Sequence, residues 1–137
     1  MSVGDVLKKV HCWLRPGGLL INLQPYARPI NLGVRLGGER RDAGIALENT
    51  EKLEDMKASL RTVTEDVAAG LFSMRNELKW QFEMQYPTPA DWREFLDRPS
   101  NGGIEADPEL IEDALGRPDG YVYSVEDDLA QAYERLA

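Results

Sequence analysis

The stretch WLRPGGLLINLQP, residues 13–25, predicts the end of a helix, a tight turn and a strand. Pro16 disfavours helical geometry in the residue before it, and the two glycines that follow supply any positive φ that the turn needs. Residues 19–23 are apolar at four of five positions, which is typical of a strand covered on both faces in a parallel sheet. Apolar residues recur upstream at helical spacing, at Val3, Val6, Leu7, Val10 and Leu14.

The next segments extend this α/β pattern. Residues 30–47 leave two interpretations open, a hairpin that turns at Gly37-Gly38 or a loop over the sheet. A helix is predicted from about Asn49 to near Gly70, because apolar residues follow a three-four alternation there. Residues 78–86 alternate strictly between large apolar and polar side chains, which predicts a long strand with one buried face and one wetter face.

Three more helices are expected toward the C-terminus. They span residues 88–96, 107–116 and 124–137, with Thr88, Asp107 and Ser124 as their N-caps. A loop is expected at residues 99–103 and a turn at residues 117–120. The whole pattern predicts an α/β fold with a helical C-terminal end, in a single domain of residues 1–137.

Composition limits the classes of partner. The chain has 137 residues and a formal net charge of −8, which argues against nucleic acid and against an anionic membrane surface. No apolar run approaches the ~20 residues of a membrane helix, and the N-terminus lacks the pattern of a signal peptide. A single cysteine, Cys12, excludes an internal disulfide. We therefore expect a cytoplasmic protein.

The segment VLKKVHCWLRPGGLLINLQP, residues 6–25, resembles the class I S-adenosylmethionine-dependent methyltransferases. In that family a segment of this kind forms the helix before the fifth strand, and then that strand. The later order is also similar: a long helix ending in GLF, the strand LKWQFEMQYP and a short helix at ADWREFL. Over residues 3–97 the resemblance implies a partial Rossmann-like methyltransferase sheet, the region of strands five to seven, with flanking helices.

The chain departs from that family at the methyl donor. Family members bind the donor with a glycine-rich loop after the first strand and an acid at the end of the second, and neither element is present here. The resemblance therefore implies no cofactor-binding residue in this chain alone, and S-adenosylmethionine binding only if a partner supplies the donor site. In the family, strand five lies between strand four and strand seven. We accordingly expect a second copy, as in a homodimer, or another chain to cover the edge of residues 19–23.

Few side chains are candidates for a site. By the geometry of the family, Gln24, Pro25 and Tyr26 would lie closest to a substrate cleft. Arg40 and Arg41 form the one concentrated positive patch, which either holds an anionic substrate or pairs with neighbouring acids.

Other residue types point to structural roles. The only histidine, His11, is adjacent to Cys12, and neighbouring helix residues point about 100° apart, so both are expected to be structural or on the surface. The many acids suit helix caps and solvated faces, and no metal site or catalytic residue is predicted. Five large apolar residues could form either an aromatic cage for a substrate or part of the buried core. We expect them to belong to the core: Trp80, Phe82, Met84, Tyr86 and Trp92.

Two functions remain as hypotheses. The first is a methyltransferase-like C-terminal fragment or subunit without independent methyl transfer, which completes a site with a partner chain. The alternative is a non-catalytic oligomerisation or small-ligand-binding module derived from the same fold. A glycine-rich strand-loop sequence in the neighbouring reading frame would favour the first.

Overall fold

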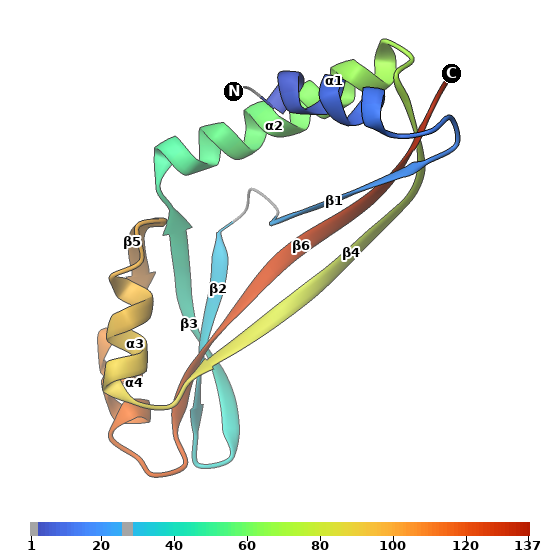
Figure 1. The fold of residues 1–137 in the computed structure, drawn as a ribbon. Coiled ribbons are helices and arrows are strands. Elements are labelled where there is room, and N and C mark those ends of the chain that lie inside the picture. Colours follow the sequence, from blue (N-terminus) through green and yellow to red (C-terminus); the bar gives the residue numbers. More distant parts are fainter. Residues whose placement is uncertain (1–2, 26–28) are drawn as a thin grey trace. The chain divides into compact units, whose positions relative to one another are not determined.

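The computed structural model describes residues 3–25 and 29–137 (Figure 1). Among these residues lie four helices, α1 (Val3–Trp13), α2 (Thr50–Ala68), α3 (Pro89–Leu96) and α4 (Pro108–Leu115). They also form six strands, β1 (Leu19–Pro25), β2 (Ile30–Leu36), β3 (Glu39–Glu48), β4 (Phe72–Tyr86), β5 (Asn101–Ala106) and β6 (Tyr121–Arg135).

The strands form one sheet in an α/β fold, as the sequence predicts. Their order is β1-β6-β2-β3-β5, and β4 also pairs with β6. The prediction of a parallel sheet is wrong, because β1 pairs in antiparallel register with the last strand of the chain. The chain divides into two compact units. Unit 1 comprises Met1–Tyr26, Glu54–Trp80 and Asp128–Ala137, and unit 2 comprises Ala27–Leu53 and Gln81–Asp127.

In unit 1, β1 pairs with the C-terminal half of β6, from Leu19 opposite Glu134 to Pro25 opposite Asp128. The helices α1 and α2 lie on one side of β1 (Figure 1). A small buried cluster joins these helices to the strands and consists of Leu7, Val63, Phe72 and Tyr133. The helix side of this sheet is therefore the covered side.

In unit 2, β2 and β3 form a hairpin that turns at Gly37-Gly38. Both glycines have positive φ, 56° and 83°, as the tight hairpin turn with two left-handed central residues requires. Of the two interpretations of residues 30–47, the hairpin is confirmed. β2 also pairs with the N-terminal half of β6, and β3 pairs with β5.

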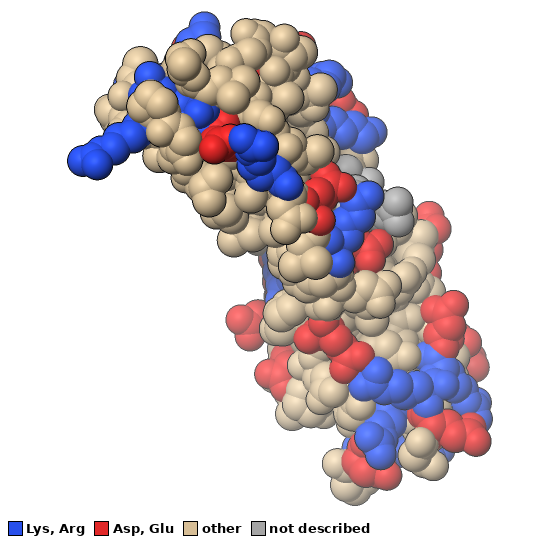
Figure 2. Space-filling model, turned by 90° about the vertical axis from the view of Figure 1, so that its right-hand side faces the viewer, with Lys and Arg blue, Asp and Glu red and all other residues tan. Residues whose placement is uncertain are grey.

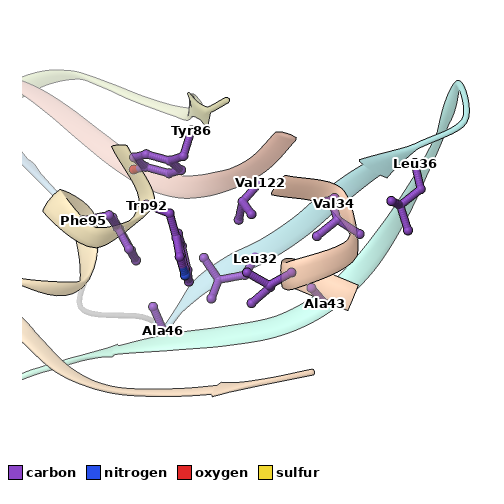
Figure 3. Packing of buried hydrophobic residues seen from close by; sticks show 11 residues of the cluster. Leu32, Val34, Leu36, Ala43, Ala46, Tyr86, Trp92, Phe95 and Val122 are labelled. Carbon is purple, nitrogen blue, oxygen red and sulfur yellow. The ribbon is translucent and has the colours of Figure 1, made fainter. Parts of the chain in front are cut away.

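The core of unit 2 lies between this sheet and the helices α3 and α4 (Figure 3). Trp92 and Phe95 of α3 stack with ring centroids 5.1 Å apart and pack with Leu32 of β2. Val34 and Val122, on neighbouring strands, are fully buried beside them. Burial of these large side chains explains why short helices of eight residues are stable here.

The caps predicted for α3 and α4 are confirmed. Thr88 accepts a hydrogen bond from the backbone N–H of Asp91, and proline occupies the first turn of the helix. Asp107 accepts hydrogen bonds from the backbone N–H groups of Glu109 and Leu110. The sequence alone located both helix starts because capping chemistry is local.

Two predictions near the C-terminus are wrong. Residues 124–137 do not form a helix, because residues 121–135 belong to β6, where burial alternates at Val122, Ser124 and then Leu129 onward. Ser124 is buried in the core rather than capping a helix. The segment expected as a loop, residues 99–103, includes the start of β5, whose backbone pairs with β3.

Candidate binding surface

One face of unit 1 is apolar and exposed. Leu19, Ile21 and Leu23 of β1 have exposed fractions of 57%, 56% and 67%, while Leu20 and Asn22 alternate with them on the other face. Leu20 packs against the helix-side cluster, so the three exposed residues point away from α1 and α2. The prediction that this strand is covered on both faces is therefore wrong.

The central strand of unit 1 adds small residues to this face. In the β1–β6 register, Ala132 lies opposite Ile21 and Ala130 lies opposite Leu23. Directly opposite residues of an antiparallel pair project to the same face of the sheet. The two alanines of β6 therefore lie beside the exposed leucines and isoleucine of β1.

The strand β4, which pairs with β6, also carries exposed apolar residues in unit 1. Gln131 lies opposite Asn22 on the helix side, and its Nε2 donates to Oε2 of Glu77 at 2.9 Å. Leu78 and Trp80 of β4 are also exposed. Their exposed fractions are 62% and 37%. We name the surface formed by β1 and β6 the apolar face, made of Leu19, Ile21, Leu23, Ala130 and Ala132.

Part of the predicted buried face of β4 is thus exposed. In unit 2, Phe82 and Met84 also have exposed fractions of 46% and 38%. Of the residues weighed as cage or core, only Tyr86 and Trp92 lie in the core, with ring centroids 5.9 Å apart. The prediction of core is confirmed for these two and wrong for the other three. Strict alternation revealed two faces of the strand, but it contained no signal for what covers each.

The free edge of β1 adjoins the apolar face. In the part of the chain that the structure describes, β1 lies at the end of the sheet order and pairs only with β6. Residues 19–23 carry no charge. Charged side chains are one of the common devices by which proteins prevent edge pairing, and this edge has none of them.

The arginine patch lies at the hairpin of unit 2. Arg40 donates two hydrogen bonds to the carboxylate of Glu83, at 2.6 and 2.9 Å, and a third to Oη of Tyr121 at 3.0 Å. Its guanidinium carbon lies 4.4 Å from the ring centroid of Tyr123. The hydrogen bond from Arg40 lowers the pKa of Glu83 and also lowers the pKa of Tyr121. Arg40 is thus occupied by an acid of its own chain.

Arg41, beside it, is exposed and lies 3.7 Å from a carboxylate oxygen of Glu39. On the face drawn in Figure 2, Lys and Arg side chains lie among Asp and Glu side chains. Both arginines therefore have acidic neighbours. Of the two alternatives for this patch, an anionic substrate or pairing with neighbouring acids, the structure contains the pairing.

The other predicted site residues lie at the end of β1. The backbones of Gln24 and Pro25 are in register with Leu129 and Asp128 of β6, and Tyr26 falls outside the described residues. Cys12 is exposed, and Nε2 of His11 lies 3.2 Å from the carbonyl oxygen of Leu136. The structure therefore gives His11 a structural contact.

Unit 2 contains a small cavity that the sequence did not indicate. Its volume is about 60 Å³, and Glu48, Lys52, Phe95 and Arg98 are among its lining residues. Oε2 of Glu48 is buried without a hydrogen bond, with Nζ of Lys52 at 3.6 Å. Sites for drug-sized ligands measure roughly 300–1,000 Å³, so this cavity suits water or a very small polar molecule rather than an adenosyl group.

Within residues 3–25 and 29–137, no group of three or more potential ligand side chains is placed to hold a metal ion. No helix in the described part of the chain is long and apolar enough to span a membrane. Comparisons with protein families, curated proteins and solved structures found no match to this chain.

Proposed function

We propose that this chain is a methyltransferase-like subunit, without methyl transfer of its own, whose unit 1 sheet is completed by another polypeptide. The observation that carries the proposal is the apolar face beside the free edge of β1. Burying apolar surface stabilises an assembly by about 25 cal/mol per Å², so an uncovered face of this kind favours association.

The pairing of β1 supports the methyltransferase part of the proposal. In the family that residues 6–25 resemble, strand five has strand seven on one side and strand four on the other. Here β1 has the last strand of the chain, β6, on one side and a free edge on the other. The free edge is therefore where a strand from a donor-binding half would be added, giving the partial Rossmann-like sheet that the resemblance implies.

A second candidate function is a non-catalytic oligomerisation or small-ligand-binding module derived from the same fold. The small cavity of unit 2 favours it, because about 60 Å³ lined by Glu48, Lys52 and Arg98 suits a very small polar molecule. In this case the apolar face serves assembly alone.

A calorimetric titration with S-adenosylhomocysteine distinguishes the two candidate functions. We expect the purified chain to give no heat above dilution. Mixed with the product of an adjacent reading frame that carries a strand followed by G-x-G-x-G, it should bind at micromolar affinity. Binding by the chain alone would contradict the proposal. A mixture that gains no binding, or an unrelated neighbouring frame, would favour the second candidate.

A further inference from the structure

The small cavity of unit 2 lies where β3 ends and α2 begins. Glu48 is the last residue of β3, and Lys52 lies in the first turn of α2. Between them, Asn49 donates from its backbone N–H to the carbonyl oxygen of Ser100 at 2.8 Å, and from Nδ2 to that of Pro99 at 2.7 Å. These bonds hold the loop between α3 and β5 against the start of α2, so two walls of the cavity are fixed to each other.

A bulge in the sheet helps to position the acid of this cavity. Across the β3–β5 pair, Leu47 lies opposite Gly103 and Glu48 lies opposite Asn101, so the register passes over Gly102. A Cβ atom on Gly102 would lie 2.3 Å from the carbonyl oxygen of Glu48, and glycine therefore allows the two backbones to approach here. Bulges of this kind change the direction of a side chain and are frequent next to functional sites.

The acid itself is buried and incompletely hydrogen-bonded. The side chain of Glu48 is only 7% exposed, and its Oε2 accepts no hydrogen bond from the residues that the structure describes. Nζ of Lys52 lies 3.6 Å from this oxygen, which supplies a positive charge but exceeds hydrogen-bond distance. Burial of a carboxylate without hydrogen-bond donors is costly. A ligand that donates N–H groups to this carboxylate would remove part of that cost.

Two cations border the same cavity. One is Lys52, and the other is Arg98, whose guanidinium carbon lies 5.0 Å from the ring centroid of Phe95. A guanidinium that stacks on a ring keeps its in-plane N–H donors for other partners, and their fork matches a carboxylate. Glu126 is the second acid of the lining, so two acids and two bases surround the space. A ligand with both charges and no net charge suits this lining best.

The volume of the cavity limits the ligand to a few atoms. A water molecule needs roughly 10–15 Å³ of such space, so about 60 Å³ holds about four to six non-hydrogen atoms. We infer that the cavity binds a small zwitterionic amino acid, glycine or alanine, whose ammonium group donates to Glu48 and whose carboxylate accepts from Arg98. The inference rests on the second candidate function, for which it names the ligand, and not on methyltransferase ancestry.

Titration of the isotope-labelled chain with glycine, followed by the NMR signals of its backbone amides, tests the inference. We expect saturable shifts at residues 47–52 and 100–101, with a dissociation constant in the millimolar range because so few atoms make contact. A lack of saturable shifts up to about 50 mM glycine overturns the inference and leaves the cavity to water. That result would leave the proposed function to its own test, in which the neighbouring chain restores S-adenosylhomocysteine binding.

Three other probes test the chemistry of the ligand. Acetate and methylammonium each carry one of the two charged groups, so each should bind at least about 10-fold more weakly than glycine. Free leucine carries both charged groups but is too large for the cavity, and it should give no saturable shift. Binding of acetate, methylammonium or leucine as tight as that of glycine would contradict a small zwitterion as the ligand.

Two variants locate the ammonium contact. Glu48→Gln keeps the shape of the side chain and removes its charge, so glycine should bind at least about 10-fold more weakly. Glu105→Gln is the matched control, because Glu105 is exposed on the neighbouring strand β5 and lies outside the lining of the cavity. Equal glycine affinities of the two variants would overturn the inference.

Arg98→Gln tests the other end of the ligand. Arg98 is exposed, so its replacement should leave the fold intact. Glycine should bind at least about 10-fold more weakly, whereas the weak binding of methylammonium, which has no carboxylate, should not change. An equal loss for both probes would contradict a contact between Arg98 and the carboxylate. The amide spectrum of each variant without ligand, compared with that of the parent chain, separates loss of the site from loss of fold.

Discussion

The hydroxyl groups of Tyr86 and Ser124 lie 3.0 Å apart in the core of unit 2, where both residues are at least 95% buried. Tyr86 ends β4, and Ser124 lies in the N-terminal half of β6. The Tyr86 ring also packs on Phe95 of α3, with centroids 5.0 Å apart. One hydrogen bond thus joins two strands beneath a helix, and each hydroxyl depends on the other because both are shielded from water.

Removing one hydroxyl of this pair should destabilise unit 2. Tyr86→Phe leaves the Ser124 hydroxyl buried without its partner, and we expect a loss of about 1–3 kcal/mol in the free energy of unfolding. Ser124→Ala should have a similar effect. The double variant should cost less than the sum of the two, because it leaves no unpaired group. Urea denaturation of the four proteins gives the coupling energy, and strict additivity would contradict a shared bond.

A second prediction concerns Gly33, which lies opposite Tyr123 across the β2–β6 pair. A Cβ atom at position 33 would lie 2.2 Å from Cζ of the tyrosine ring, so the ring occupies the space that any side chain needs. Gly33→Ala should therefore displace Tyr123 and its contact with Arg40, at a cost of about 1–3 kcal/mol.

The background Tyr123→Ser supplies the control for this prediction. With the ring removed, Gly33→Ala should cost little, since alanine suits an extended strand better than glycine. Thermal unfolding of the single and double variants measures the difference. An equal loss in both backgrounds would show that the tyrosine ring is not what excludes a side chain at position 33.

Only part of the fold could be predicted from the sequence. Local signals located the helix starts at Thr88 and Asp107 and the turn at Gly37-Gly38, because caps and tight turns are set by neighbouring residues. The final strand was missed because its residues 126–135 are mostly good helix formers, and pairing with β1, β2 and β4 outweighs that preference.

The exposure of the apolar face could not be predicted from the sequence, for a related reason. A run such as residues 19–23 shows that a strand is apolar, but only the tertiary pairing shows which face the helices cover. The cross-strand contacts of Arg40 with Glu83 and Tyr121 join residues 43 and 81 positions apart in sequence. No local pattern specifies such pairs, although the concentration of arginine and acid at residues 38–42 did suggest pairing.

The ion pair of Arg40 and Glu83 predicts a pH dependence. Arg40 lowers the pKa of Glu83 in the folded chain, so the pair contributes stability above the ordinary carboxyl pKa of about 4.3. This contribution disappears as the pH falls through the lower folded pKa. The stability difference between the parent chain and Glu83→Gln should therefore be largest near neutral pH and should shrink below about pH 4.

Urea midpoints at neutral and acid pH measure this difference. Glu94→Gln is the control, because Glu94 is exposed on α3 and should give a smaller and less pH-dependent change. Adding about 0.5 M salt at neutral pH should also reduce the effect of Glu83→Gln, because both partners of the pair reach solvent. A difference that grows on acidification would contradict the pairing.

Two threonines with opposite roles in helices give the last prediction. Thr88 caps α3: its Oγ1 accepts from the backbone N–H of Asp91 at 3.2 Å and donates to the carboxylate of Asp91 at 2.6 Å. Thr88→Ala should cost about 1 kcal/mol. Thr64 lies inside α2, where its hydroxyl donates to the carbonyl oxygen of Leu60, a bond that slightly weakens helices. Thr64→Ala should therefore be neutral or mildly stabilising.

The two variants make the same chemical change at exposed positions, so their difference isolates the cap. Fluorescence of Trp92, which lies on α3, reports the unfolding of unit 2 once Trp13 and Trp80 are replaced by phenylalanine. Thr88→Ala should lower the urea midpoint of this signal, while Thr64→Ala, in unit 1, should leave it unchanged. Because α3 contributes both Trp92 and Phe95 to the core, a frayed first turn should loosen the packing against Leu32 as well. An unchanged midpoint for Thr88→Ala would mean that core packing alone fixes this helix.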